Sequence, residues 1–268
     1  MSVIQIITAV NNYVQYERYI KNNPFYRNFD LVPFDNINER LAVPVRYNHF
    51  INTFLRPDAW VMFCHQDFSV NEDLSCKLSS LDRNCIYGPV GIKSYRCTDV
   101  ILRVKGPRAF TMEKKRFFEN KFCGQIMQGF DGDESKARLC GEKVNRPLEV
   151  DTVDSCCLII HSSLIREHGL RFDENFDFNL FGADFSIMAR KCYNIKTKVL
   201  QLNCFHLSEG RRNVGYLRCL SRLVKKYPDE KIVLTFSDER EVDAFRYFFA
   251  NENSGEVIKS FISMREDY

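Results

Sequence analysis

The stretch AWVMFCHQD, residues 59–67, decides the fold class of this 268-residue chain. Six consecutive apolar residues lead directly into three polar ones, His65, Gln66 and Asp67. A short continuous apolar run is typical of a strand that is buried on both faces, and the change to polar residues marks its end. Open parallel sheets bind ligands at the carboxyl ends of their strands. We therefore expect a functional site at this polar triplet.

The segments on the N-terminal side of this strand alternate between strand and helix patterns. They predict a β-branched first strand at 3–10, a helix at 13–21, a second strand at 29–34 and a second helix at 43–55. Strand, helix, strand, helix, strand is the order typical of a parallel sheet with crossover helices. We therefore expect an α/β protein with a mainly parallel, Rossmann-like sheet flanked by helices.

The C-terminal side continues this pattern up to about residue 210. We predict a core strand at 150–161, a short helix at 162–168 closed by Gly169, a helix at 184–193, and a strand at 198–202 leading to His206. After residue 210 the composition changes, so we expect two domains, 1–210 and a mostly helical C-terminal extension at 211–268. Residues 211–226 contain six basic residues and no acidic one. This segment is either a helix attracted to an anionic membrane surface or a helix whose Leu face packs on the core.

Composition excludes several classes of protein. Apolar residues make up 45% and charged residues 27%, as in ordinary globular domains, and a net charge of +3 is too small to indicate bulk nucleic-acid binding. The 11 cysteines show no CxxC spacing, and several lie in apolar runs, so we interpret them as reduced and buried. We find neither a signal-peptide pattern nor a membrane-spanning run of about 18 apolar residues, so we expect a cytoplasmic protein.

Three positions could take part in chemistry. His65 and Asp67, two residues apart on an extended segment, would face the same side, where a carboxylate can hold a hard divalent cation. Alternatively, Asp67 caps a following helix and His65 is only a polar strand end. Asp184 is either the N-cap of its helix or a general base facing a cleft. His206 is either a structural hydrogen-bonding residue or, if the fold brings it near Asp67, a metal ligand.

Taken in order, these features resemble the GT-A glycosyltransferases of family 2, and most closely a bacterial branch with an HQD or HDD triplet in place of DxD. The resemblance covers about residues 3 to 208 and rests on segments 6–10, 46–52, 61–67, 87–91, 153–160, 170–176, 181–186 and 205–206. Residues 92–148 and the tail match no part of the family pattern. The chain departs from that pattern where His65 replaces the usual first Asp and where Ala183 replaces the Glu of the usual Glu-Asp pair.

The resemblance implies an inverting glycosyltransferase that moves a sugar from a nucleotide-diphospho-sugar to a glycan or lipid-linked acceptor. It implies Mn²⁺ or Mg²⁺ held by Asp67, with His65 and His206, and Asp184 as the catalytic base. The implied donor-binding residues are Thr8, Ala9, Val10, Asn11, Asp35, Asn48 and Gln66, and the implied acceptor-binding residues are Asp154 and Ser155.

The expected biological setting is the synthesis of a bacterial surface polysaccharide, capsule or lipooligosaccharide. We expect no nucleic-acid partner, and peripheral contact with the inner face of the cell membrane through residues 211–226. Two alternatives remain open at this point: a non-catalytic member that binds sugar nucleotide, and a nucleotidyltransferase built on a similar sheet. The donor base and sugar, the acceptor, the linkage and the oligomeric state are not predicted.

Overall fold

The computed structural model describes residues 3–93, 100–104, 110–114, 123–130, 132–207, 214–227, 230 and 232–234. The chain forms two compact units. Unit 1 consists of Met1–Lys93 and Phe122–Gly210, and unit 2 of Ser94–Lys121 and Arg211–Tyr268. Residues 94–121, which the sequence pattern assigns to the first domain, therefore group with the C-terminal segment. Most of residues 94–121, and the part of the expected helical extension after residue 234, lie outside the described residues.

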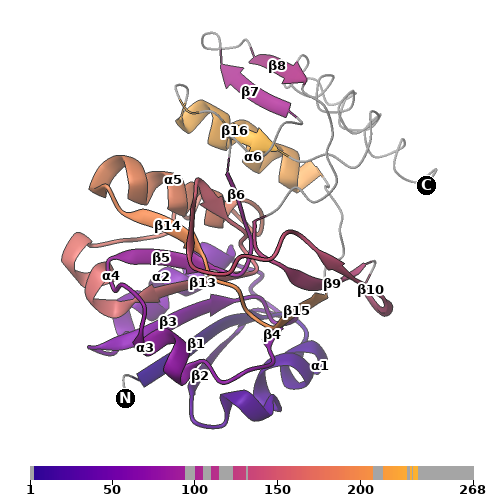
Figure 1. Cartoon of the computed structure of the whole chain (residues 1–268), viewed down its shortest axis with the longest axis vertical. Helices are drawn as coiled ribbons and strands as arrows, with labels where there is room; N and C mark the ends of the chain where they lie inside the picture. Colours follow the sequence, from indigo (N-terminus) through magenta and orange to yellow (C-terminus); the bar gives the residue numbers. More distant parts are fainter. Residues whose placement is uncertain are drawn as a thin grey trace. The chain divides into compact units, whose positions relative to one another are not determined.

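The central sheet of unit 1 has seven strands. In order across the sheet they are β11 (Leu148–Val150), β14 (Lys196–Val199), β5 (Cys85–Gly88), β13 (Cys157–His161), β3 (Ala59–Cys64), β1 (Val3–Val10) and β2 (Asp30–Asp35). Figure 1 shows them stacked from β2 at the lower edge towards β14. Strands β2, β1, β3, β5 and β14 run in one direction, whereas β13 and β11 run in the other. The expected mainly parallel α/β sheet is confirmed.

The predicted strand at 150–161 is wrong in its extent. The structure has three short strands there: β11, β12 (Thr152–Val153), which pairs with β6 (Gly91–Ile92), and β13. Residues 154–156 form a turn between β12 and β13. Because β13 is antiparallel to β3, with Cys157 opposite Cys64, this turn lies at the carboxyl end of β3. The break therefore brings polar residues to the edge of the sheet where the HQD triplet lies.

A second, four-stranded sheet has the order β10 (Asp133–Cys140), β9 (Ile126–Phe130), β15 (Cys204–Leu207) and β4 (Phe68–Val70). The strand predicted at 198–202 is also wrong in its extent, because β14 ends at Val199. The chain then leaves the central sheet and forms β15 in the four-stranded sheet. β4 begins directly after Asp67, and β15 runs antiparallel to it with His206 opposite Phe68. In Figure 1, β4 and β15 lie together beyond the carboxyl ends of β1 and β3.

The helices of unit 1 lie largely within the ranges that the sequence pattern predicts, although one short helix was not predicted and the last one begins earlier than expected. They are α1 (Tyr13–Tyr16), α2 (Val43–Thr53), α3 (Ser75–Ser79), α4 (Ser162–His168) and α5 (Phe181–Tyr193), with a π-helical turn at Glu17–Lys21 and a 3-10 turn at Pro24–Tyr26. Asn12 caps α1, since its side chain accepts the N–H groups of Val14 and Gln15. Gly169, at φ 60°, ends α4 in the left-handed conformation that glycine adopts at low cost.

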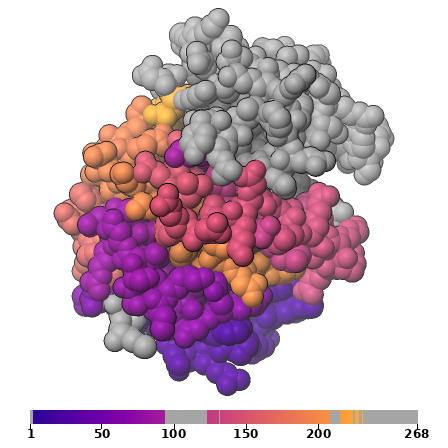
Figure 2. Space-filling view, viewed as in Figure 1, coloured from indigo at the N-terminus to yellow at the C-terminus, as the bar shows by residue number. Residues whose placement is uncertain are grey.

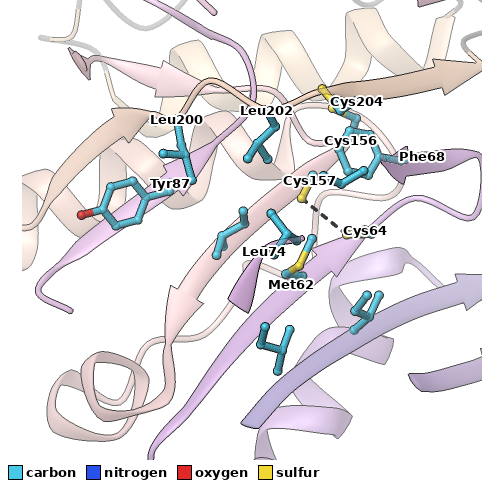
Figure 3. Packing of buried hydrophobic residues seen from close by; sticks show 14 of the residues in the cluster. Met62, Cys64, Phe68, Leu74, Tyr87, Cys156, Cys157, Leu200, Leu202 and Cys204 are labelled. Carbon is cyan, nitrogen blue, oxygen red and sulfur yellow. Dashed lines mark hydrogen bonds between the residues drawn. The ribbon is translucent and has the colours of Figure 1, made fainter. Parts of the chain in front are cut away.

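The hydrophobic core of unit 1 fills the space around β3 and β13. Trp60, Met62 and Cys64 on β3, with Cys157 and Ile159 on β13, are all buried. Figure 3 shows Cys64 and Cys157 facing one another, with 3.4 Å between their Sγ atoms. Both are free thiols, and burial raises the pKa of Cys157. The expectation of reduced, buried cysteines therefore holds for this pair.

In the space-filling view the surface of residues 123–160, in pink, adjoins the indigo and purple surface of the N-terminal segment (Figure 2).

Within unit 2, the described elements are a three-stranded sheet and a helix: β16 (Ile232–Leu234), β7 (Val100–Val104), β8 (Phe110–Lys114) and α6 (Val214–Lys226). On α6 the side chains of Leu217, Leu220 and Leu223 are buried, whereas Arg218 and Arg222 are exposed. No described helix combines the length and the apolar character that crossing a bilayer requires.

Candidate metal and sugar-transfer site

His65, Asp67 and His206 meet where the central sheet joins the second sheet. One potential ligand atom from each lies within 4.8 Å of the others. The contact follows from the topology, because β4 continues from Asp67 and β15 pairs with β4, so that the Leu207 N–H donates to the Asp67 carbonyl at 3.0 Å. The Nε2 atom of His206 lies 3.6 Å from Oδ1 of Asp67. The structure thus brings together all three residues predicted as metal ligands.

The environment of His65 suits a neutral, metal-binding imidazole. Its Nε2 atom is buried and has no hydrogen-bond partner among the described residues. Burial, and secondarily His206, lower the pKa of His65 to about 4, against the opposite effects of Asp67 and Asp154. A buried imidazole nitrogen without a partner is unfavourable unless a ligand takes its lone pair. Two imidazoles and one carboxylate are a common donor set for divalent transition metals such as Mn²⁺, so these residues fit a metal ion.

The turn before β13 joins this group to the rest of the site. The His65 N–H donates to the carbonyl of Cys156 at 3.0 Å, which ties the triplet to the turn. The carboxylate of Asp154 accepts the Cys156 N–H at 2.8 Å, and its side chain is exposed. The hydroxyl of Ser155 accepts the N–H of Gly182 at 3.0 Å. The two residues predicted to contact the acceptor therefore lie between His65 and the start of α5.

Asp184 lies inside the first turn of α5, so the alternative that it caps the helix is wrong. The helix begins three residues earlier than expected, at Phe181, and its N-cap is Leu180 with φ 59°. Asp184 is 2% exposed, and its backbone N–H donates to the carbonyl of Leu180 at 2.9 Å. Asp184 is therefore not the N-cap, and it lies on a helix that is bonded to the Ser155 turn.

The predicted donor-binding residues at the end of β1 surround Gln66. The side-chain oxygen of Gln66 accepts the N–H groups of Asn11 and Asn12, each at 2.9 Å, and its amide nitrogen donates to Asn11 Oδ1 and Gln15 Oε1. Gln66 thus fixes the β1–α1 turn against the metal-binding triplet. Thr8 is buried, and its hydroxyl has no partner among the described residues.

The other predicted donor-binding residues have different surroundings. Ala9 is partly buried and Val10 is fully buried, and the carbonyl of Val10 accepts the N–H of Asn36 at 2.7 Å. Asp35 is exposed at the end of β2, and its carboxylate accepts the N–H of Ile37. Asn48 is 6% exposed and uses its amide to hold Phe172. We therefore assign Asn48 to loop positioning, not to direct contact with a ligand.

Sequence reasoning missed two features of the site. The first is Ser186, whose hydroxyl donates to the carbonyl of Gly182 at 2.8 Å and accepts the N–H of Val153, so that it fastens α5 to β12. The second is Phe178, whose ring stacks on the imidazole of His65. Ser186 follows Gly182 at the helical spacing of four, which could have indicated a back-bonding serine. No sequence signal distinguishes Phe178 from the other aromatic residues of its loop.

Comparison with solved structures supports the architecture. The crystal structure of GalNAc-T7 with UDP, GalNAc and Mn²⁺ superposes with a TM-score of 0.53 at 10% sequence identity, over 99% of this chain and 54% of that one. The chain has the GT-A fold. It spans about half the length of the GalNAc-T7 structure, 54%. At this identity the likeness shows the GT-A fold alone.

Two S. aureus structures also match, at lower TM-scores. TarS aligns at 0.46, with 11% identity over 93% of this chain and 43% of that one. TarS 1–349 in complex with UDP aligns at 0.43, with 12% identity over 94% of this chain and 71% of that one. No model of a protein family matches the sequence, and no curated protein is detectably similar to it in sequence.

Proposed function

We propose that the chain is a metal-dependent, inverting glycosyltransferase that uses a nucleotide-diphospho-sugar. The proposal rests on one observation: in a GT-A fold, His65, Asp67 and His206 converge at the carboxyl edge of the sheet, next to the turn that anchors the helix of Asp184. Every residue with a proposed role in metal binding or sugar transfer belongs to unit 1. The GalNAc-T7 structure contains UDP and Mn²⁺, so UDP-sugars and Mn²⁺ are the first donor and ion to test, with Mg²⁺ as the alternative.

In this proposal His65, Asp67 and His206 hold the cation. A bound divalent cation neutralises the negative charge that grows on a departing diphosphate. The low pKa of His65 keeps its imidazole neutral at physiological pH, which is the state that binds metal. Gln66 holds the turn formed by Asn11 and Asn12 beside them, at the end of β1, where the nucleotide of the donor would bind.

Asp184 acts as the general base. Its carboxylate takes the proton of the acceptor hydroxyl while that oxygen forms a bond to the anomeric carbon, and the bond from that carbon to the diphosphate breaks. Attack from the face opposite the leaving group inverts the anomeric configuration. Asp154 and Ser155, in the turn between His65 and α5, lie where they can contact the acceptor or the donor sugar.

We further propose a cytoplasmic enzyme of bacterial surface polysaccharide synthesis, with a glycan or lipid-linked acceptor. The exposed Arg218 and Arg222 of α6 support electrostatic contact with an anionic membrane face. Because Leu217, Leu220 and Leu223 are buried, this contact would use charge and not insertion of the apolar face.

Asp184→Asn tests the assignment of the base. We expect the variant to lose transfer by about a hundred- to ten-thousandfold while binding nucleoside diphosphate normally, because general-base catalysis contributes about 10²–10⁴-fold. Release of nucleoside diphosphate from a panel of sugar nucleotides measures transfer, and calorimetry measures binding. Glu167→Gln, which neutralises an exposed carboxylate on α4, is the control. Near-normal turnover of Asp184→Asn would show that the base is another group, and release of pyrophosphate would indicate a nucleotidyltransferase.

A further inference from the structure

Phe178 is the exposed member of an otherwise buried aromatic group. It is 53% exposed, whereas the aromatic residues around it in the sequence are between 0% and 3% exposed: Phe172, Phe176, Phe181 and Phe185. A single exposed apolar side chain is ordinary on a protein surface. The position of Phe178 is not ordinary, because its ring stacks on His65 with 4.7 Å between centroids and 26° between planes.

The loop that presents Phe178 is fixed by hydrogen bonds. The carbonyl of Asp177 accepts the N–H of Val43 at 3.1 Å, which ties the loop to the start of α2. The carboxylate of Asp177 accepts the N–H groups of Phe178 and Asn179. Phe176, two residues earlier, is completely buried and anchors the same loop in the core. A ring held in this way loses little conformational freedom when a ligand covers it, which favours binding.

The surroundings of the ring combine an apolar surface with carboxylates. Asp154 and Asp177 are both exposed, and Asp154 accepts the N–H of Cys156, whose carbonyl accepts the N–H of His65. A pyranose ring has an apolar C–H face and hydroxyl groups at its rim. An aromatic ring can cover the C–H face, while carboxylates accept hydrogen bonds from the hydroxyls.

The place of Phe178 in the fold favours contact with the acceptor and not with the nucleotide of the donor. Phe178 precedes α5, the helix of Asp184, and Leu180 at the N-cap bonds directly to Asp184. Five of the seven predicted donor-binding residues lie at the ends of β1 and β2, on the other side of β3 from β13 in the sheet order, whereas Asn48 lies on α2 and Gln66 follows β3. A sugar ring on the outer face of Phe178 would therefore lie beside the proposed base and metal site, away from the nucleobase.

We propose that Phe178 is the stacking platform for the acceptor, and that the acceptor presents a pyranose ring to it. This inference rests on the proposed function, because it assumes that Asp184 activates an acceptor hydroxyl. Phe178 covers one sugar face and Asp154 and Asp177 contact its hydroxyls. Together, these three side chains would orient the reacting hydroxyl of the acceptor towards Asp184.

Saturation-transfer NMR on the full chain tests the platform without turnover. The probes are methyl pyranosides of the common hexoses and N-acetylhexosamines, each measured with UDP and Mg²⁺ present, because Mg²⁺ is diamagnetic. We expect at least one pyranoside to receive saturation mainly on the protons of one ring face. Phe178→Ala and Phe178→Leu should weaken its binding roughly two- to tenfold, the effect of losing an aromatic contact of about 0.5–1.5 kcal/mol. Phe178→Trp should retain the binding.

Phe54→Ala is the matched control, since Phe54 is similarly exposed, 48%, but lies after α2 against Phe34 and His49. Phe178→Leu keeps apolar bulk, so it separates ring stacking from a general loss of loop packing. Absence of pyranoside binding to the unaltered chain, or equal binding to Phe178→Ala, would overturn the platform. A lower Mn²⁺ affinity of Phe178→Ala in the absence of sugar would also overturn the platform, because it would show that the ring serves to shield His65. Failure of the proposed function would be seen separately: the chain would bind the sugar but would release no nucleoside diphosphate from any sugar nucleotide.

Discussion

The hydroxyl of Ser155 accepts a hydrogen bond from the backbone N–H of Gly182, with 3.0 Å between the two atoms. This bond joins the turn that holds His65 to the helix that contains Asp184. The approach is close: a Cβ atom at Gly182 would lie 3.0 Å from both Cα and Oγ of Ser155. The relative position of the proposed metal ligands and the proposed base therefore depends on this contact.

Gly182→Ala should impair catalysis more than binding. The added methyl group has to push the Ser155 turn and α5 apart by a few tenths of an ångström, and misplacement on the scale of 1 Å can cost about a hundredfold in rate. We expect kcat to fall at least about tenfold while the affinity for nucleoside diphosphate stays within about twofold. Ser155→Ala should have a smaller effect, and Ser155→Thr, which restores the hydroxyl, should recover part of the loss. A change confined to KM for the donor would contradict this role.

Asp67→Asn should weaken Mn²⁺ binding, because it removes the only negative charge among the three proposed ligands. We expect a loss of more than about tenfold in affinity, measured by calorimetry or electron paramagnetic resonance. Asp73→Asn is the control, since Asp73 is an acidic residue whose carboxylate accepts the N–H of Ser75. Equal Mn²⁺ affinities for the Asp67 and Asp73 variants would remove the basis for a cation at this place.

Asn48→Asp should destabilise unit 1, and acid should partly restore it. The amide nitrogen of Asn48 donates to the carbonyl of Phe172 and to Glu174, both at 2.9 Å. An ionised Asp would place an oxygen against these two acceptors in a buried site, at a cost of about 1–3 kcal/mol or more. Burial and repulsion would raise the pKa of this Asp above its unfolded value, so the variant should regain stability as pH falls towards that value.

Chemical denaturation of the Asn48→Asp variant at several pH values provides the measurement. Asn48→Ala, which introduces no charge, is the control and should show no additional recovery in acid. A pH dependence of Asn48→Asp identical to that of Asn48→Ala would mean that the introduced carboxylate is solvated.

His161 should make unit 1 less stable in mild acid. Burial, and secondarily Arg83, lower the pKa of His161, against the opposite effect of Asp58. The unfolded chain therefore takes up a proton near pH 6.5 more readily than the folded chain does, and the free energy of unfolding falls as pH drops below about 6.5. His65 contributes with the same sign. A His161→Gln variant should lack the loss of free energy of unfolding that His161 causes on acidification. As pH falls from about 7.5 to 5, the stability of the variant should therefore approach or exceed that of the unaltered chain.

Denaturation curves for the two proteins at each pH give this comparison. A difference in free energy of unfolding that stays constant over the whole range would show that His161 takes up protons equally in both states.

Local sequence was sufficient for the elements on which the site is built. The apolar run at 59–64 and the polar residues after it place β3 and its carboxyl end correctly. Asn12 and Gly169 mark helix ends through their own side-chain and backbone chemistry. Asp184 was assigned to a helix but to the wrong position in it, because Leu180 and Phe181 give no recognisable start signal.

The sequence by itself determined the parallel α/β core, the polar triplet at the end of β3 and the residue types of a candidate metal site. Tertiary structure alone decided that 154–156 is a turn, that β15 pairs with β4, and that Phe178 covers His65. The physical reason is the range of the interactions. Strand and helix signals arise between residues a few positions apart, whereas His206 reaches Asp67 through pairing of two strands far apart in the chain.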